Sequence, residues 1–143
     1  VIDRFIKIIK PNKIFLGEKD MQQLKIVEEF INRNKIKTKV IACKTIRETN
    51  GLAYSSRNLL LTPMEKRIAS KIYNLLKGRK KKLVKNKKFL KQTKTAILKY
   101  GVNKIDYLEC HDINKLIPSY KKNIRYKIFV AYYLGSTRLI DNI

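Results

Sequence analysis

The first 43 residues alternate between two kinds of apolar spacing, and this alternation restricts the possible folds more than any other feature of the sequence. Residues 13–16 and 38–43 are short apolar runs of the kind found in buried strands. Between them, residues 20–34 show the spacing of an amphipathic helix. A further helical face precedes the first strand and consists of Ile2, Phe5, Ile6 and Ile9. A strand, a helix and a strand in this order predict a βαβ unit and therefore a parallel sheet.

After residue 44 the order of the predicted elements changes. Residues 45–61 show no clear period and are predicted to form a long loop. The segment Thr62-Pro63-Met64-Glu65 combines an N-cap residue, a first-turn proline and an acidic residue at the third helical position, so we expect a helix to begin there. A second, basic helix is expected over residues 85–100, with Gly101 as its stop.

Two strands are predicted after these helices, over residues 104–110 and 125–134, joined by a turn-rich connection that contains Pro118. Helices followed by strands, without alternation, are typical of an α+β domain. We therefore expect a partial α/β domain over residues 1–44. A C-terminal α+β domain with antiparallel strands should follow over residues 45–143 and begin with the long loop.

The net charge of +23 raises the hypothesis of a nucleic-acid partner. Residues 66–105 contain 15 basic side chains and no acidic one. However, 26 of the 34 basic residues are lysine, and lysine, isoleucine and asparagine are the residues that A+T-rich codons encode. The densest part, residues 79–88, lacks the interleaved aromatic and glycine residues that nucleic-acid modules use. A solvated helical face explains the block equally well, so a basic RNA-binding module is kept only as an alternative.

The two cysteines, Cys43 and Cys110, lie far apart and have no neighbouring histidine or cysteine that could complete a metal site. We expect both to be buried free thiols in a reducing cytoplasm. The longest aromatic-aliphatic run, residues 128–134, is too short to span a bilayer, so no membrane partner is expected. The sequence opens with Val1 instead of methionine, inside a helical pattern, which favours an N-terminally truncated chain.

The segment FLGEKDMQQL, residues 15–24, lies where the first predicted strand ends, and ligands of open α/β sheets bind at such ends. Gly17 would let a ligand approach the backbone, and Lys19 could hold a phosphate. Gln23 can donate and accept hydrogen bonds, as recognition of a hydroxy acid requires. A structural interpretation is equally open, in which Asp20 caps the following helix and Gln23 completes a capping box.

The segment RETNGLAYSSRN, residues 47–58, also follows a predicted strand. Ser55 and Ser56 beside Arg57 suit a triphosphate, because hydroxyl and guanidinium groups stabilise charge that develops on phosphate oxygens. Asn50-Gly51 and the serine pair are also common in turns, so the segment alone is weak support for a phosphate site.

Together the two segments resemble the pantothenate synthetase family. The match consists of Gly-Glu-Lys-Asp with two glutamines and, about thirty residues later, Arg-Glu followed by Gly-Leu-Ala-x-Ser-Ser-Arg-Asn. Residues 131–142 also resemble the C-terminal strand and tail of that family, so the likeness runs nearly end to end. It implies the C-terminal part of a Rossmann-like, nucleotidyltransferase-type parallel sheet, followed by the small α+β domain.

The resemblance also implies a reaction. The family is an AMP-forming ligase of coenzyme A biosynthesis that uses ATP and Mg²⁺ to join pantoate to β-alanine through a pantoyl adenylate, in the cytoplasm and as a homodimer. The ATP-binding positions carried over to this chain are Gly17, Glu18, Lys19, Asp20, Ile46, Tyr54, Ser55, Ser56 and Arg57. Lys19, Ser55, Ser56 and Arg57 are the expected catalytic residues, and Gln23 is the expected pantoate-binding residue. No protein ligand for a metal is expected.

Two family features do not occur in this sequence. A His-x-x-Gly-His signature that contacts ATP, and a second pantoate-binding glutamine downstream of it, belong to the first half of the family's fold. The only histidine, His111, lies at the end of the strand predicted over residues 104–110 and is interpreted as a surface or half-buried residue without a catalytic role. We therefore expect this chain to be inactive alone, and a non-catalytic remnant of the family is the second alternative.

Overall fold

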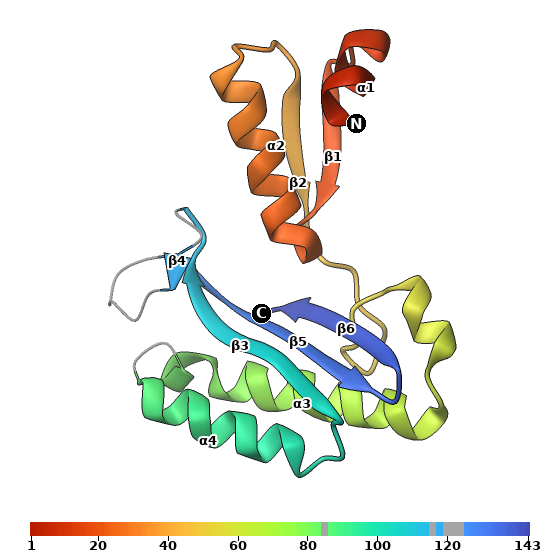
Figure 1. The fold of residues 1–143 in the computed structure, drawn as a ribbon, viewed down its shortest axis with the longest axis vertical. Coiled ribbons are helices and arrows are strands. Elements are labelled where there is room, and N and C mark those ends of the chain that lie inside the picture. Colours follow the sequence, from red (N-terminus) through yellow and green to blue (C-terminus); the bar gives the residue numbers. More distant parts are fainter. Residues whose placement is uncertain (84–85, 115–116, 119–124) are drawn as a thin grey trace. The chain divides into compact units, whose positions relative to one another are not determined.

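The computed structural model describes residues 1–83, 86–114, 117–118 and 125–143. The chain forms two compact units, Val1–Thr45 and Ile46–Ile143, and each is described here by itself (Figure 1).

The first unit is a βαβ arrangement preceded by a short helix. Its elements are α1 (Ile2–Ile9), β1 (Lys13–Gly17), the 3₁₀ turn η1 (Glu18–Asp20), α2 (Met21–Arg33) and β2 (Lys39–Cys43). The two strands pair in parallel, from Lys13 opposite Lys39 to Gly17 opposite Cys43. The apolar face of α2 packs with α1 and both strands in a small core built around Ile6, Val27 and Ile31. The predicted parallel sheet is confirmed.

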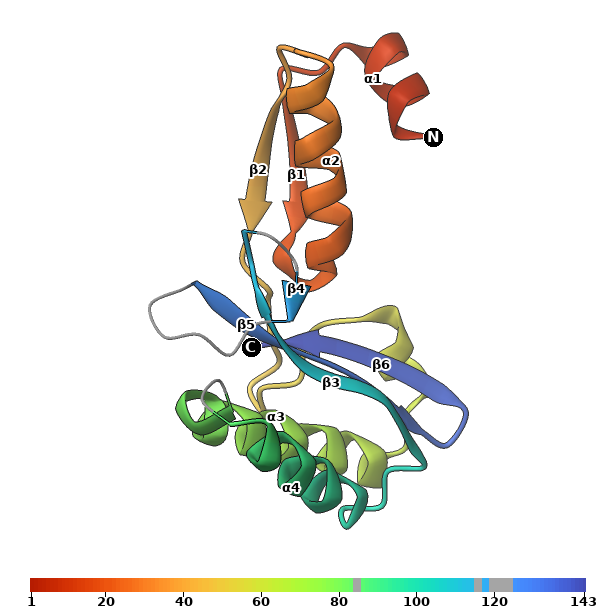
Figure 2. The same ribbon diagram turned by 60° about the vertical axis from the view of Figure 1, so that its left-hand side comes forward.

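The second unit is a layer of two helices against an antiparallel sheet. Its elements are η2 (Ser56–Leu60), α3 (Pro63–Leu83), α4 (Lys87–Leu98), β3 (Lys104–Asp112), β4 (Ile117–Pro118), β5 (Tyr126–Leu134) and β6 (Thr137–Asn142). The strand order is β4-β3-β5-β6. Figures 1 and 2 show α3 and α4 together on one face of this sheet, where their apolar residues meet alternate residues of the strands. The predicted α+β architecture is confirmed.

The start of α3 has the predicted N-cap residue and acidic third position, and Thr62 and Glu65 pair there as a capping box. The Thr62 backbone N–H donates to Glu65 Oε2 at 2.8 Å, and the Glu65 N–H donates to Thr62 Oγ1 at 3.2 Å. Each side chain thus satisfies a backbone donor that the first helical turn leaves unpaired. This reciprocal pairing fixes where the preceding loop ends.

Three details differ from the sequence-based expectations. The expected loop over residues 45–61 contains the 3₁₀ helix η2, because a serine-capped turn continues for five residues. A separate strand, β6, pairs antiparallel with β5 after the turn at Gly135. In the connection that contains Pro118, residues 117–118 pair with β3, and residues 115–116 and 119–124 lie outside the described part.

One of the two cysteine predictions is wrong. Cys110 is buried in β3, as expected, and desolvation raises the pKa of its thiol to about 11. Cys43 is exposed, because it is the last residue of the short two-stranded sheet, where little packs over it. Both are free thiols.

The basic block occupies α3 and α4. Buried positions in these helices are apolar or small and comprise Ala69, Ile72, Leu76, Leu83, Leu90, Thr93 and Ile97. Most of the lysines lie on the opposite, exposed faces. This is the arrangement of a solvated amphipathic helix pair. Among the described residues, no helix is long and apolar enough to cross a membrane.

Candidate functional site

The first predicted site segment lies at the carboxyl end of β1. Gly17 is the last residue of this strand, Glu18–Asp20 form one 3₁₀ turn, and the exposed Gln23 lies in the first turn of α2. Gly17 adopts φ −70° and ψ 132°, which any residue can adopt, and an added Cβ would meet nothing within 4 Å. Neither backbone conformation nor packing within the described residues therefore requires glycine here.

The capping interpretation of Asp20 is wrong. Asp20 occupies the N-cap position of α2, but its side chain makes no capping hydrogen bond to the described helix. The reason is the 3₁₀ turn before it. A capping side chain reaches the first helical amides from an extended backbone, whereas Asp20 enters the helix at φ −97° and ψ 56°.

The second predicted segment begins with a tight hairpin over residues 46–54. Arg47 and Ala53 form an antiparallel bridge, and the Tyr54 N–H donates to the Ile46 carbonyl at 3.0 Å. The turn requires Gly51, because its φ of +91° disfavours other residues and an added Cβ would clash with the ring of Tyr73. The hairpin thus packs its turn directly on α3.

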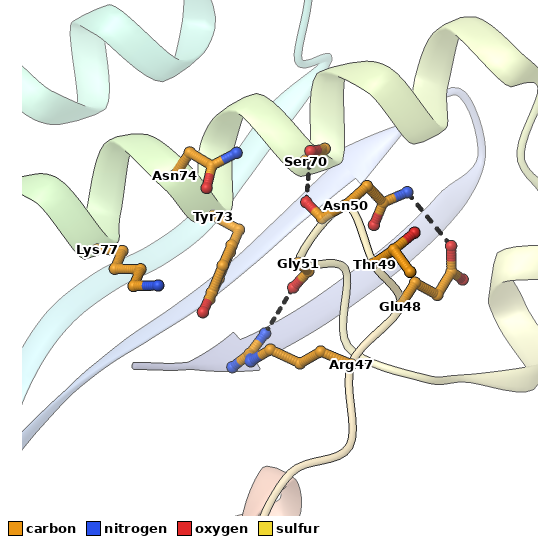
Figure 3. A pocket seen from close by; sticks show the side chains of 9 residues that line it. All are labelled: Arg47, Glu48, Thr49, Asn50, Gly51, Ser70, Tyr73, Asn74 and Lys77. Atoms are coloured by element: carbon orange, nitrogen blue, oxygen red, sulfur yellow. Dashed lines mark hydrogen bonds between the residues drawn. The ribbon is translucent and has the colours of Figure 1, made fainter.

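Arg47 anchors this hairpin to the C-terminal strand. Its guanidinium donates to Asp141 Oδ2 at 2.7 Å and to Asp141 Oδ1 at 2.9 Å, a two-point contact between residues 94 positions apart. The same group donates to the Gly51 carbonyl at 3.0 Å, drawn in Figure 3, and lies 4.3 Å from the centre of the Tyr73 ring. Burial alone would lower the pKa of Arg47, but the hydrogen-bonded charge of Asp141 raises it above its ordinary value.

Residues 55–57 follow the hairpin at the start of η2. Ser55 is the N-cap, and its Oγ accepts a hydrogen bond from the Arg57 N–H at 3.3 Å. Ser56 and Arg57 are exposed, and Arg57 Nη1 donates to the Arg138 carbonyl of β6 at 3.0 Å. Two hydroxyls and a guanidinium thus follow the hairpin directly, and two of the three side chains, those of Ser56 and Arg57, are exposed.

Asn58 is a residue of this segment to which sequence reasoning assigned no role. Its side chain is buried, at 4 % exposure, and Nδ2 donates to Glu48 Oε1 at 2.9 Å and to the Ala53 carbonyl at 3.1 Å. The one sequence feature that indicates this contact is that Glu48 and Asn58 are polar residues near the two ends of the second motif.

A polar cavity of about 390 Å³ opens beside the hairpin (Figure 3). It is lined by Arg47, Glu48, Thr49, Asn50, Gly51, Ser70, Tyr73, Asn74 and Lys77. None of these lining residues is an expected ATP-binding residue. The Ser70 hydroxyl donates to the Asn50 carbonyl at 2.6 Å, so part of the wall is a contact between hairpin and α3.

His111 lies outside both segments, as expected. It is half-buried in β3, 2.7 Å from Glu109 Oε2 and with its ring centre 5.3 Å from that of Phe129. In the described part of the chain, no three His, Cys, Asp or Glu side chains gather as a protein-built metal site would require.

The expected ATP-binding residues are divided between the two units. Residues 17–20 lie together at the end of β1, with Gln23 in the helix that follows. Ile46 and residues 54–57 lie together in the second unit, joined by the hairpin. The union of these two groups in one site remains a prediction.

The family model for pantoate-beta-alanine ligase matches residues 1–143, the whole chain. The chain belongs to the pantoate–β-alanine ligase family. It is 37 % identical to the pantothenate synthetase of Flavobacterium psychrophilum over 148 residues and 40 % identical to that of Clostridioides difficile over 148 residues. These alignments cover 100 % and 99 % of this chain and 52 % of each relative.

Solved structures of this ligase family share the fold. The crystal structure of pantothenate synthetase from Thermus thermophilus matches with a TM-score of 0.86 and 27 % identity, over 99 % of this chain and 52 % of that one. The enzyme from Francisella tularensis, complexed with beta-gamma ATP and β-alanine, matches with a TM-score of 0.74 and 33 % identity, over 99 % and 47 %. The chain thus spans about half the length of the curated relatives it matches.

Proposed function

We propose that the full-length gene product that contains this chain condenses pantoate with β-alanine at the expense of ATP. In the first step a pantoate carboxylate oxygen attacks the α-phosphorus of ATP, and pyrophosphate leaves. In the second step the amine of β-alanine attacks the carbonyl carbon of pantoyl adenylate, and AMP leaves with the bonding electron pair. The amine proton passes to solvent, and the product is pantothenate.

The likeness to the Francisella tularensis enzyme carries this proposal, because that protein is complexed with beta-gamma ATP and β-alanine and matches nearly the whole chain. Two local features support it. The open backbone at Gly17 leaves room for a ligand at the end of a parallel strand, where nucleotides bind. Exposed Ser56 and Arg57 offer a hydroxyl and a guanidinium to phosphate oxygens.

Six of the site residues have a proposed role. Lys19 and Arg57 neutralise the charge that builds on the phosphates as pyrophosphate leaves, and Ser55 and Ser56 add hydrogen bonds. Gln23 holds pantoate, and the Ile46 backbone contacts the adenine. Magnesium arrives with the nucleotide as part of the substrate, since Mg²⁺ is commonly held by substrate phosphates and water.

We also propose that this chain is inactive by itself, that the full-length product is a homodimer, and that it works in the cytoplasm. Inactivity follows if the histidine signature of the family's first half is needed to hold ATP. Light scattering on the purified full-length product would test the dimer directly.

Pantoate-dependent exchange of labelled pyrophosphate into ATP tests the first step. We expect exchange in the full-length product, none in residues 1–143 alone, and a loss of at least about a hundredfold with Lys19→Ala. Lys25→Ala is the matched control, because Lys25 lies on α2 and pairs with Glu28 at 2.7 Å, outside the proposed site.

Failure of exchange in the full-length product would contradict the proposal and favour a non-catalytic remnant. The basic α3–α4 surface would then be tested with structured RNA at increasing salt. Binding that weakens steeply with salt and survives both Lys19→Ala and Arg57→Ala would support the RNA-binding alternative.

A further inference from the structure

Asn58 directly follows residues 55–57, and its side chain ties them to the start of the hairpin. Nδ2 donates to Glu48 Oε1 at 2.9 Å and to the Ala53 carbonyl at 3.1 Å. Both neighbouring atoms are acceptors, so the nitrogen of the amide must face them. The orientation of Asn58 is therefore set by the chemistry of its surroundings.

Glu48 is a fixed partner for this amide. Its backbone N–H donates to the Leu52 carbonyl at 2.8 Å, and its carbonyl accepts the Gly51 N–H at 2.8 Å. The adjacent Arg47 is bound to Asp141 of the C-terminal strand. Asn58 thus connects an exposed segment to a hairpin that is itself anchored to the sheet.

The two ends of the Asn58 amide differ in their hydrogen bonding. Its Oδ1 is buried and makes no hydrogen bond within the described residues. A buried, unpaired acceptor lowers stability, but an apolar side chain at this position alone would leave Glu48 Oε1 and the Ala53 carbonyl without this donor. The two directed bonds from Nδ2 are what an apolar residue could not supply.

We propose that Asn58 and Glu48 form a positioning pair that holds Ser55, Ser56 and Arg57 in the geometry that receives the phosphates of ATP. This inference rests on the proposed function. Neither member of the pair contacts the nucleotide. Asn58 fixes the end of the segment, and Glu48 supplies the charged acceptor that makes the link strong.

Four variants of the full-length product test the pair through pyrophosphate exchange. Asn58→Ala should lower kcat on the order of tenfold to a hundredfold and leave the KM for pantoate unchanged, because Gln23 lies elsewhere. Glu48→Gln keeps an oxygen acceptor but loses the charge, so it should lower kcat, by less than Asn58→Ala does.

The decisive comparison uses Asn58→Asp, alone and with Glu48→Gln. Asn58→Asp alone places a carboxylate against two hydrogen-bond acceptors, Glu48 Oε1 and the Ala53 carbonyl, so it should be the least active variant. In the double variant the new amide at position 48 can donate to the new carboxylate at position 58, so at least about tenfold of the lost activity should return. Recovery should be incomplete, because the Ala53 carbonyl still lacks a donor.

Hydrogen exchange of residues 54–61 gives a readout independent of catalysis. Amide hydrogen exchange of these residues should accelerate in Asn58→Asp and slow again in the double variant. Amide hydrogen exchange in α3 should be the same in all variants. If the double variant recovers neither activity nor protection while its thermal midpoint equals that of Asn58→Asp, the positioning pair is refuted. An inactive wild type would refute the proposed function instead. The amide hydrogen exchange of residues 54–61 would then still show whether Asn58 and Glu48 hold this segment.

Discussion

Replacement of Arg47 by lysine tests how the structure holds the hairpin of the candidate site. The arginine makes two hydrogen bonds to Asp141, at 2.7 and 2.9 Å, and further bonds to the Gly51 carbonyl at 3.0 Å and the Asn142 carbonyl at 3.1 Å. The paired side chains are only 18 % and 12 % exposed. Lysine keeps the charge but cannot reproduce the planar fork.

The expected cost follows from this burial. Loss of one partner from a buried ion pair costs about 3–5 kcal/mol, and the retained charge of lysine recovers part of it. We therefore expect Arg47→Lys to lower the free energy of unfolding of the second unit by about 2–3 kcal/mol. For a unit of about 100 residues this corresponds to a fall of about 10–20 °C in Tm.

Urea and thermal unfolding, followed by circular dichroism, measure this effect in the full-length product. The matched control is Arg33→Lys, because the Arg33–Glu29 pair is 78 % and 70 % exposed and should contribute less than about 1 kcal/mol. A double-mutant cycle with Asp141→Asn should give a coupling energy of at least about 1 kcal/mol. A loss below about 0.5 kcal/mol for Arg47→Lys would refute the view that this contact anchors the hairpin.

Three further predictions concern stability. Gly51→Ala should cost more than about 2 kcal/mol in urea unfolding, because φ is +91° and the new Cβ would clash with the Tyr73 ring; an unchanged midpoint would contradict the turn. Thr62→Ala should cost about 1 kcal/mol, since it removes the capping box with Glu65, and no change would show that the cap is not formed in solution. The pKa of the Cys110 thiol is raised in the folded protein, so the thiol of the unfolded chain ionises at lower pH and the free energy of unfolding should fall between pH 9.0 and about 11. The fall should be smaller in Cys110→Ala, and equal slopes in the two proteins would contradict the burial of this thiol.

The sequence predicted those parts of the fold whose signals are local. Apolar spacing predicted β1, α2 and β2, and Thr62, Pro63 and Glu65 predicted where α3 begins. The same local logic failed at Asp20, because a 3₁₀ turn before the helix changes the backbone from which a cap would act. It also failed at Cys43, where an apolar strand pattern carried no information on how little covers the end of that strand.

Long-range contacts could not be predicted in this way. No local pattern links Arg47 to Asp141, 94 residues later, and the pairing of β6 with β5 depends on the turn at Gly135. Asn58 illustrates the same limit within the candidate site. By resemblance, the motif predicts that the neighbours of Asn58 bind phosphate, whereas the link from Asn58 to Glu48 depends on the folded hairpin and has no local signal.

The most direct test of the proposed ATP site is a crystal structure of the full-length product with bound ATP. We expect Lys19 Nζ and the Arg57 guanidinium both to lie within about 3.2 Å of oxygens of the same triphosphate, which would unite the two groups of site residues. A bound triphosphate that either side chain fails to reach would contradict the proposed site.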